Sequence, residues 1–139
     1  MLFPTFNTAA SGLGLFRTWM DAVSDNMANL DTVRPTSEAA FQARFVVAQS
    51  IGSGQEATTG APAGAQVSGI SFGSAEGRLV HDPTNPLADA DGMVRFPDID
   101  MGDQMTQLMI AQRGYQANLS VIDRAKDAYQ QALSIGRSS

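Results

Sequence analysis

The residues best suited to chemistry are few, and they lie in the middle of the chain. Gly69-Ile70-Ser71-Phe72-Gly73 matches the G-x-S-x-G pattern, in which a strand-to-helix turn exposes a nucleophilic serine. That pattern needs a following helix and a distant acid and histidine, whereas the only histidine, His81, lies ten residues later. We therefore interpret the two glycines as part of a strand or bulge, and we expect no catalytic role for Ser71.

Six aspartates between Asp82 and Asp103 form an acidic stretch, in which Asp89-Ala90-Asp91-Gly92 is faintly similar to a calcium loop. An EF-hand loop ends in a glutamate and lies between two helices, whereas prolines interrupt this stretch and it contains no glutamate. Asp-Pro and Asp-Gly pairs favour turns, so we expect turns here, with no metal and no cofactor. His81, the only histidine, is expected to be packed or hydrogen-bonded rather than a ligand or a base.

Composition narrows the remaining classes of function. The 139 residues carry a formal net charge of −5 with only nine basic residues, which are scattered, so we expect no nucleic-acid partner. The absence of cysteine excludes disulfides, thiolate catalysis and cysteine-ligated zinc. No basic segment precedes the first apolar residues, and no apolar run approaches the roughly 20 residues of a membrane span. We therefore expect neither a cleaved signal peptide nor a membrane anchor.

The first thirty residues carry an apolar row in alternating steps of four and three, which is typical of a helix that packs by knobs into holes. Pro35 disfavours the α conformation at Arg34, so the helix is expected to end near Leu30. The row consists of Leu2, Phe6, Ala9, Leu13, Phe16, Met20, Val23, Met27 and Leu30.

A second row follows Asp100, a suitable helix N-cap, and Gly136 is a plausible C-terminal stop. Two polar residues, Gln112 and Lys126, interrupt this row. They either specify helix register or mark a drift of the buried face onto Ala111, Asn118 and Ala125, and drift is slightly favoured because a straight helix repeats at about 3.6 residues. The apolar members are Met105, Leu108, Tyr115, Leu119, Ile122, Tyr129 and Leu133.

These elements predict a mainly α fold with a small β-rich insert. Residues 1–34 and 100–139 form helices paired as a coiled coil, and 35–99 form an insert containing a β-hairpin, all in one structural unit. Strands are expected in 41–49, 66–72, 78–81 and 93–96, and residues 51–65 as a loop that is flexible or ordered only by a partner. A helix of about 28 residues is too long for the rest of so short a chain to cover its apolar side. The helices are therefore expected to pair with each other and with neighbouring subunits, a monomeric helical hairpin capped by a small sheet being the alternative.

Three blocks of the sequence then resemble the bacterial flagellar basal-body rod proteins, of the flagellar axial rod and hook family. They are residues 11–32, 81–97 and 112–137, which occur in the family's order. The motif positions are Ser11, Gly12, Asn26 and Asn29 in the first block, Asp82, Pro83, Pro86 and Gly92 in the second, and Arg113, Tyr115 and Asn118 in the third.

The resemblance implies a structural protein and no enzyme. Such a subunit polymerises helically through its terminal helices, forming the proximal rod that transmits torque across the periplasm and the wall of the export channel. It implies partners in other rod subunits and copies of itself, the MS ring, rod-adaptor proteins and the flagellar type III export apparatus, which exports the chain without a cleaved signal. It implies no small-molecule substrate. The alternative is a non-polymerising helical adaptor that binds one partner helix.

Overall fold

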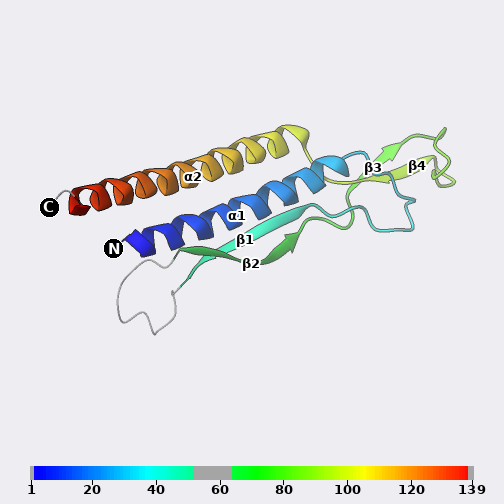
Figure 1. Cartoon of the computed structure of the whole chain (residues 1–139). Helices are drawn as coiled ribbons and strands as arrows, with labels where there is room; N and C mark the ends of the chain where they lie inside the picture. Colours follow the sequence, from blue (N-terminus) through cyan, green and yellow to red (C-terminus); the bar gives the residue numbers. More distant parts are fainter. Residues whose placement is uncertain (1, 52–63, 138–139) are drawn as a thin grey trace.

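The protein is an elongated pair of helices that carries two small β-hairpins (Figure 1). The computed structural model describes residues 2–51 and 64–137. This architecture confirms the predicted fold class, mainly α with a small β-rich insert between long terminal helices. Along the chain the elements are α1 (Leu2–Ala28), β1 (Arg44–Ser50), β2 (Ala65–Phe72), β3 (Arg78–His81), β4 (Met93–Phe96) and α2 (Met101–Arg137).

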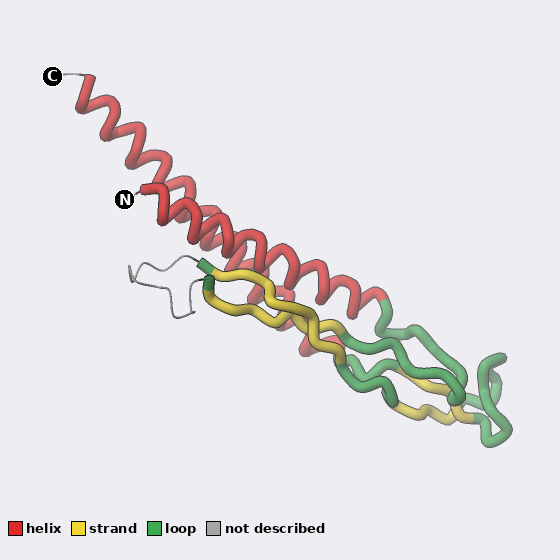
Figure 2. The backbone as a smooth tube through the Cα atoms, turned by 90° about the horizontal axis from the view of Figure 1, so that it is seen from below, coloured by secondary structure: helices red, strands yellow, loops and turns green. Residues whose placement is uncertain are grey.

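The two helices are antiparallel, so both ends of the chain lie at one end of the molecule (Figure 1). Helix α1 has 27 residues and α2 has 37, which corresponds to lengths of about 40 Å and 55 Å. Figure 2 shows that the longer helix, α2, continues past the beginning of α1. The last stretch of α2 therefore has no helix of its own chain beside it.

Each hairpin is a separate two-stranded antiparallel sheet. The β1–β2 hairpin lies along α1, which is therefore covered by α2 on one side and by this hairpin on the other (Figures 1 and 2). A β-bulge interrupts its register between Val47 and Ala48. The β3–β4 hairpin lies beyond the ends of the helices, opposite the chain termini.

The hydrophobic core is thin because the molecule is mostly two elements deep. Its buried apolar side chains are mainly small, and they lie between the two helices and within the insert. In the described part of the chain they are Ala9, Ala22, Val23, Ala40, Ala43, Val94, Ile99 and Ala111. Larger apolar side chains are consequently left at the surface.

Element boundaries differ from the sequence predictions at three places. Helix α1 ends at Ala28, and Leu30 lies in the turn that follows. Helix α2 passes through Gly136, so the prediction of a stop there was wrong. Strand β1 begins at Arg44 rather than at residue 41, because the preceding backbone pairs irregularly: Ala40 N–H donates to the carbonyl of Ala75 at 2.8 Å.

Two other expectations concern the capping of α2 and the loop of the first hairpin. The carboxylate of Asp100 accepts the backbone N–H of Asp103 at 2.9 Å, which confirms Asp100 as the N-cap. Of the segment 51–65 expected to be flexible, residues 52–63 lie outside the described residues. The description resumes at Gly64, and the N–H of the next residue, Ala65, donates to the hydroxyl of Ser11 at 3.1 Å.

Candidate assembly surface and polar junction

Helix α1 buries the apolar row expected from its sequence. All the row's side chains that the structure describes between residues 6 and 27 are buried or half-buried, with Ala9 and Val23 the most enclosed. The side chain of Leu2 lies outside the described part. Helix α1 has neighbours on two sides, so a broad part of its surface is covered.

Helix α2 buries a different row from the one that strict heptads suggest. Its buried face runs through Ala111, Asn118 and Ala125, while Gln112 and Lys126 are exposed, which confirms the drift. Leu108, Tyr115 and Ile122 of the predicted row lie on this face, whereas Met105, Leu119, Tyr129 and Leu133 point to solvent. The full face is Gln104, Gln107, Leu108, Ala111, Gly114, Tyr115, Asn118, Ile122 and Ala125.

The two helices approach closely because glycines face larger side chains. A Cβ atom added to Gly114 would lie 2.4 Å from the ring of Phe16, and one added to Gly12 would lie 2.7 Å from the amide nitrogen of Asn118. Both distances are shorter than any van der Waals contact, so a side chain at Gly12 would require Asn118 to move and one at Gly114 would require Phe16 to move. The family-motif residues Gly12 and Asn118, from opposite ends of the sequence, therefore meet.

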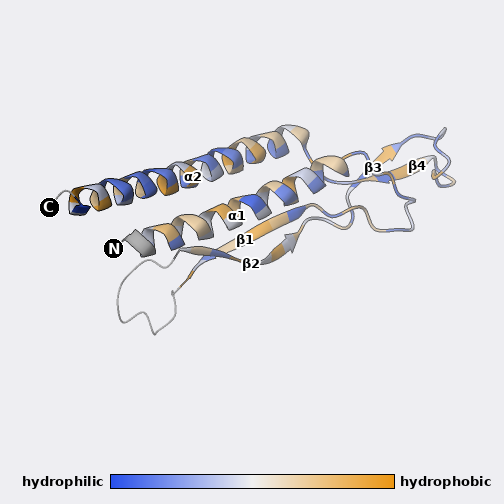
Figure 3. Cartoon of the chain, viewed as in Figure 1, coloured by the Kyte–Doolittle hydropathy of each residue, from blue (hydrophilic) through white to orange (hydrophobic). Residues whose placement is uncertain are grey.

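In Figure 3 apolar and polar residues alternate along the ribbon of α2. Apolar side chains remain exposed along this helix, on more than one side of it, and we call this set the exposed row. Each is between 42% and 69% exposed, and together they extend along most of the helix. Monomeric proteins rarely expose such extended apolar surface, which usually marks an interaction site. The members are Met101, Met105, Met109, Ile110, Leu119, Val121, Tyr129, Leu133 and Ile135.

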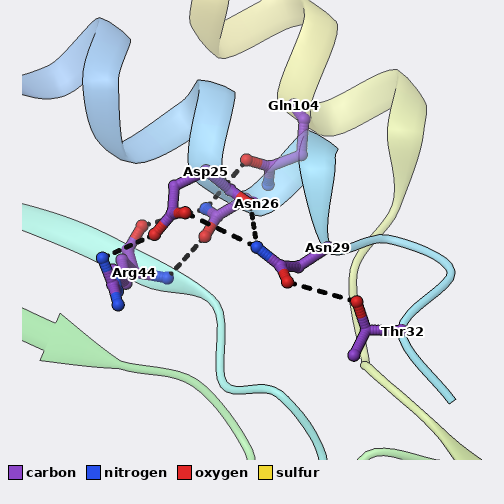
Figure 4. A network of polar contacts seen from close by, with 6 residues as sticks. All are labelled: Asp25, Asn26, Asn29, Thr32, Arg44 and Gln104. Atoms are coloured by element: carbon purple, nitrogen blue, oxygen red, sulfur yellow. Dashed lines mark hydrogen bonds and ion pairs between the residues drawn. The ribbon is translucent and has the colours of Figure 1, made fainter.

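A buried amide joins three elements at the other end of the helix pair (Figure 4). Asn26 of α1 is fully buried, and its Nδ2 donates to the Gln104 side chain of α2 and to the Arg44 carbonyl of β1, both at 3.0 Å. Its Oδ1 accepts the Arg44 N–H at 2.8 Å. Every partner has a fixed position, so Asn26 holds α1, α2 and β1 in one arrangement.

Neighbouring polar residues secure the end of α1 beside this amide (Figure 4). Asn29 Nδ2 donates to the Asp25 carbonyl at 2.9 Å, and Asn29 Oδ1 accepts the Thr32 hydroxyl at 3.1 Å. These bonds lie where the last carbonyls of a helix lack partners. The Arg44–Asp25 ion pair, 2.5 Å long, is about half exposed and therefore adds little stability.

A second side-chain bond crosses the helix pair nearer its middle. Trp19 Nε1 donates to Gln107 Oε1 at 3.3 Å, and the Trp19 ring stacks on Phe16 with centroids 6.0 Å apart. Tryptophan buries a large apolar area while its N–H keeps a partner. Trp19 thus combines packing with a directional contact that helps to fix the axial position of α2.

A shallow groove of about 390 Å³ lies between α1 and the first hairpin. Its lining mixes small, apolar and charged groups and includes no histidine. The lining residues are Thr18, Asp21, Ala22, Asp25, Arg44 and Ile70. The groove is open, which suits the side chain of a neighbouring protein better than an enclosed small molecule.

The motif residues of the middle block form tight turns beyond the helices. Gly92 has φ of 72°, and a Cβ there would lie 2.9 Å from Pro83 Cβ, so only glycine fits. The Asp82 carboxylate accepts the Thr84 hydroxyl at 2.8 Å, which lowers its pKa. The part of the block before β4 forms turns, as the sequence predicted, whereas Val94 and Pro97 at its end are buried.

The carboxylate of Asp89 closes the turn that precedes β4, and the stability of this turn should depend on pH in the acid range. This carboxylate accepts the Met93 N–H at 2.9 Å, which is the largest cause lowering its pKa, and the Thr36 hydroxyl at 2.8 Å. Because the pKa is lowered in the folded state, the ionised carboxylate stabilises the turn at pH values above the usual aspartate pKa of about 3.9. This contribution is lost as the pH falls through the folded-state pKa.

We therefore expect the Met93 amide resonance, followed by NMR through an acid titration, to report a midpoint below the usual aspartate value. The Asp89→Asn variant removes the titrating group and should abolish this transition. A Met93 midpoint at or above the usual value would contradict the prediction.

The candidate chemical residues are dispersed. Ser71 lies exposed on β2, opposite Phe45, and His81 ends β3, opposite Met93. In the described part of the chain, no three His, Cys, Asp or Glu side chains gather closely enough to hold a metal ion. Among residues 2–51 and 64–137, neither helix is both long and apolar enough to cross a bilayer.

Sequence reasoning missed three residues that contribute to this site: Gln104, Gln107 and Gly114. Asn26 was noted only as a motif residue, although its place three residues after Val23 puts it on the buried face of α1. Gly114, in the middle of a helical pattern, was likewise a signal, because such a glycine usually has a packing reason.

The sequence is similar to known proteins over almost its whole length. The family model described as "Flagella basal body rod protein" matches residues 6–36, and "Flagellar basal body rod FlgEFG protein C-terminal" matches residues 90–135. The chain is 32% identical to the flagellar basal-body rod protein FlgC of Salmonella typhimurium, over 98% of each chain. It is 33% identical to FlgC of Bacillus subtilis over 97% of this chain and 98% of the relative. For FlgC of Yersinia enterocolitica the identity is 36%, over 98% of each.

Proposed function

Because the chain belongs to the FlgC family of flagellar basal-body rod proteins, we propose that it polymerises helically through its terminal helices. The polymer is the proximal rod, a drive shaft that transmits torque and whose inner wall lines the export channel. The observation that carries the proposal is the exposed apolar row of α2, which no other element of the described chain covers.

The mechanical argument follows from the size of this row. Burying apolar area yields about 25 cal/mol per Å², so a helix with nine half-exposed apolar side chains gains substantially from neighbours on several sides. Torque is then shared by many parallel contacts between subunits. The glycine-spaced helix pair and the Asn26 junction keep each subunit rigid, so load passes between subunits instead of deforming one.

The other expectations follow from family membership and remain proposals. The helical segments 1–34 and 100–139 form the core of the rod, and the insert 35–99 lies outside it. Neighbours are copies of this chain, other rod subunits, the MS ring and rod-adaptor proteins. The chain reaches the periplasm through the flagellar type III export apparatus, without a cleaved signal peptide.

A charge within the exposed row tests the proposal. Leu119 is 43% exposed, so Leu119→Asp should leave the fold intact while placing an unpaired carboxylate in a buried interface, which costs several kcal/mol. We expect a strain that carries only this variant to export the protein, to lack complete rods in micrographs of isolated basal bodies, and to be non-motile.

The matched control is Ser120→Asp, which puts the same charge one residue along, at a position that is already polar and exposed. Far-ultraviolet circular dichroism of both purified variants checks that the helices form. Motile cells with intact rods built from Leu119→Asp would refute polymerisation through this face. A defined complex with a single partner helix would instead favour the non-polymerising adaptor.

A further inference from the structure

Three exposed methionines lie along the first turns of α2, and we call them the methionine stripe. Met101, Met105 and Met109 are 42%, 52% and 52% exposed, and their spacing of four residues places them one above another on the helix. Gln104 and Leu108, on the face toward α1, each precede a methionine of the stripe by one residue. The stripe therefore lies about 100° around α2 from the contact with α1, beside the helix interface rather than inside it.

The other methionines of the chain are less accessible. The sequence has seven methionines and no cysteine, so the methionine thioethers are its only sulfur groups. Met20, Met27 and Met93 are half-buried, and Met1 lies outside the described residues. Because the oxidation of a methionine follows the exposure of its sulfur, the stripe is expected to react before the half-buried methionines.

We propose that the methionine stripe is a reversible oxidation site that controls the entry of this chain into the polymer. The oxidant is a peroxide: the thioether sulfur attacks one peroxide oxygen, the O–O bond breaks, and sulfur loses two electrons and keeps that oxygen as a sulfoxide. With hydrogen peroxide, the second oxygen leaves as water. A dithiol-dependent methionine sulfoxide reductase reverses the change, releasing the sulfoxide oxygen as water while the dithiol becomes a disulfide.

Oxidation of the stripe changes the surface of the subunit without opening its core. A thioether is apolar and flexible, whereas a sulfoxide is polar and accepts hydrogen bonds. In the separate subunit, water satisfies the sulfoxide oxygens because the stripe is exposed. Three of the nine members of the exposed row are these methionines, so neighbours that cover the row would bury three acceptors without donors. An oxidised chain is therefore folded but disfavoured in the polymer.

The order of oxidation is measured on the purified full-length chain. The native protein is treated with dilute hydrogen peroxide and then digested with trypsin for mass spectrometry. Cleavage after Arg95 and Arg113 releases the peptide 96–113, which carries all three methionines of the stripe and no other methionine. We expect this peptide to take up oxygen at least about fivefold faster per methionine than the half-buried methionines. In urea the rates should become equal, because every sulfur is then exposed.

The effect on assembly is measured in cells that build new basal bodies with and without hydrogen peroxide. This inference rests on the proposed function, so rods are counted in micrographs of isolated basal bodies. For each strain the count with peroxide is divided by the count without it, which removes differences in the basal level of assembly. We expect the wild-type ratio to fall at least about fivefold. The ratio should stay near one in the variant without sulfur in the stripe, Met101→Leu/Met105→Leu/Met109→Leu.

Two further strains complete the comparison. Met93→Leu removes one sulfur outside the stripe and should leave the ratio as low as in wild type. Glutamine resembles a sulfoxide in carrying a polar acceptor, so the triple glutamine variant should lose rods even without peroxide. Glutamine is also a good helix former, so circular dichroism of the purified variant should show intact helices. The glutamine variant is Met101→Gln/Met105→Gln/Met109→Gln.

Three results would overturn the inference: equal oxidation rates for the stripe and the half-buried methionines in the native chain, equal ratios for wild type and the leucine variant, or normal rods from the glutamine variant. The first and third need no leucine variant. Normal rods from Leu119→Asp would overturn the proposed function instead. Normal rods from the glutamine variant, together with none from Leu119→Asp, would overturn only the oxidation site, so the two failures are distinguishable.

Discussion

Replacing Asn26 by alanine is expected to lower the free energy of unfolding by about 3 kcal/mol, because several buried groups lose their partner together. The Arg44 N–H and carbonyl and the Gln104 side-chain oxygen all bond to this amide at 2.8 to 3.0 Å. Unfolding in urea, followed by circular dichroism at several denaturant concentrations, measures the change.

Asn7→Ala is the matched control for this substitution. Asn7 lies on the same helix but is exposed, so its replacement should change stability by no more than about 0.5 kcal/mol. The comparison removes the helix propensity that both substitutions share. Equal effects at the two positions would show that the junction contributes no stability of its own.

Gly114→Leu is expected to destabilise the protein by about 3 kcal/mol, since the new side chain occupies the place of the Phe16 ring. Either the helices separate or Phe16 leaves its stack on Trp19, and both outcomes lose packed contacts. Urea unfolding again gives the magnitude. Fluorescence of Trp19, the only tryptophan, should change as the ring's surroundings become wetter.

Gly14→Leu, on the other helix, is expected to change the stability of the protein in the opposite direction. A Cβ at Gly14 meets nothing within 4 Å, so the substitution acts through helix propensity and should stabilise α1 by about 0.8 kcal/mol. If both leucines had the same effect, the close approach of the helices at Gly114 would not be a determinant of the fold.

The two helices differed in how well their sequences predicted the buried face. In α1 the first row was correct because α2 and the first hairpin cover a broad part of its surface. Helix α2 contacts only α1 among the described elements, so its buried strip is narrow and its other apolar residues are exposed. A periodic pattern marks apolar residues without separating those that meet α1 from those that meet a neighbour, and this is why Met105 and Leu119 were grouped with Leu108.

The polar junction could not be predicted from the sequence, for a different reason. Asn26 and Gln104 are separated by 78 positions, and only the antiparallel pairing of the helices brings them together. The strands were easier to predict because alternation and flanking glycines are local signals. The start of β1 was wrong because the irregular pairing of Ala40 with Ala75 depends on a partner distant in the sequence.

The bulge between Val47 and Ala48 is expected to limit the pairing of the first hairpin with strands of other molecules. A two-stranded sheet leaves the outer backbone groups of both strands unpaired, and such edges are templates for strands of other molecules. A bulge inserts an unpaired residue and increases the local twist, so a foreign strand can follow this edge for only a few residues. In the proposed polymer, this bulge would keep neighbouring copies from merging into an intermolecular sheet.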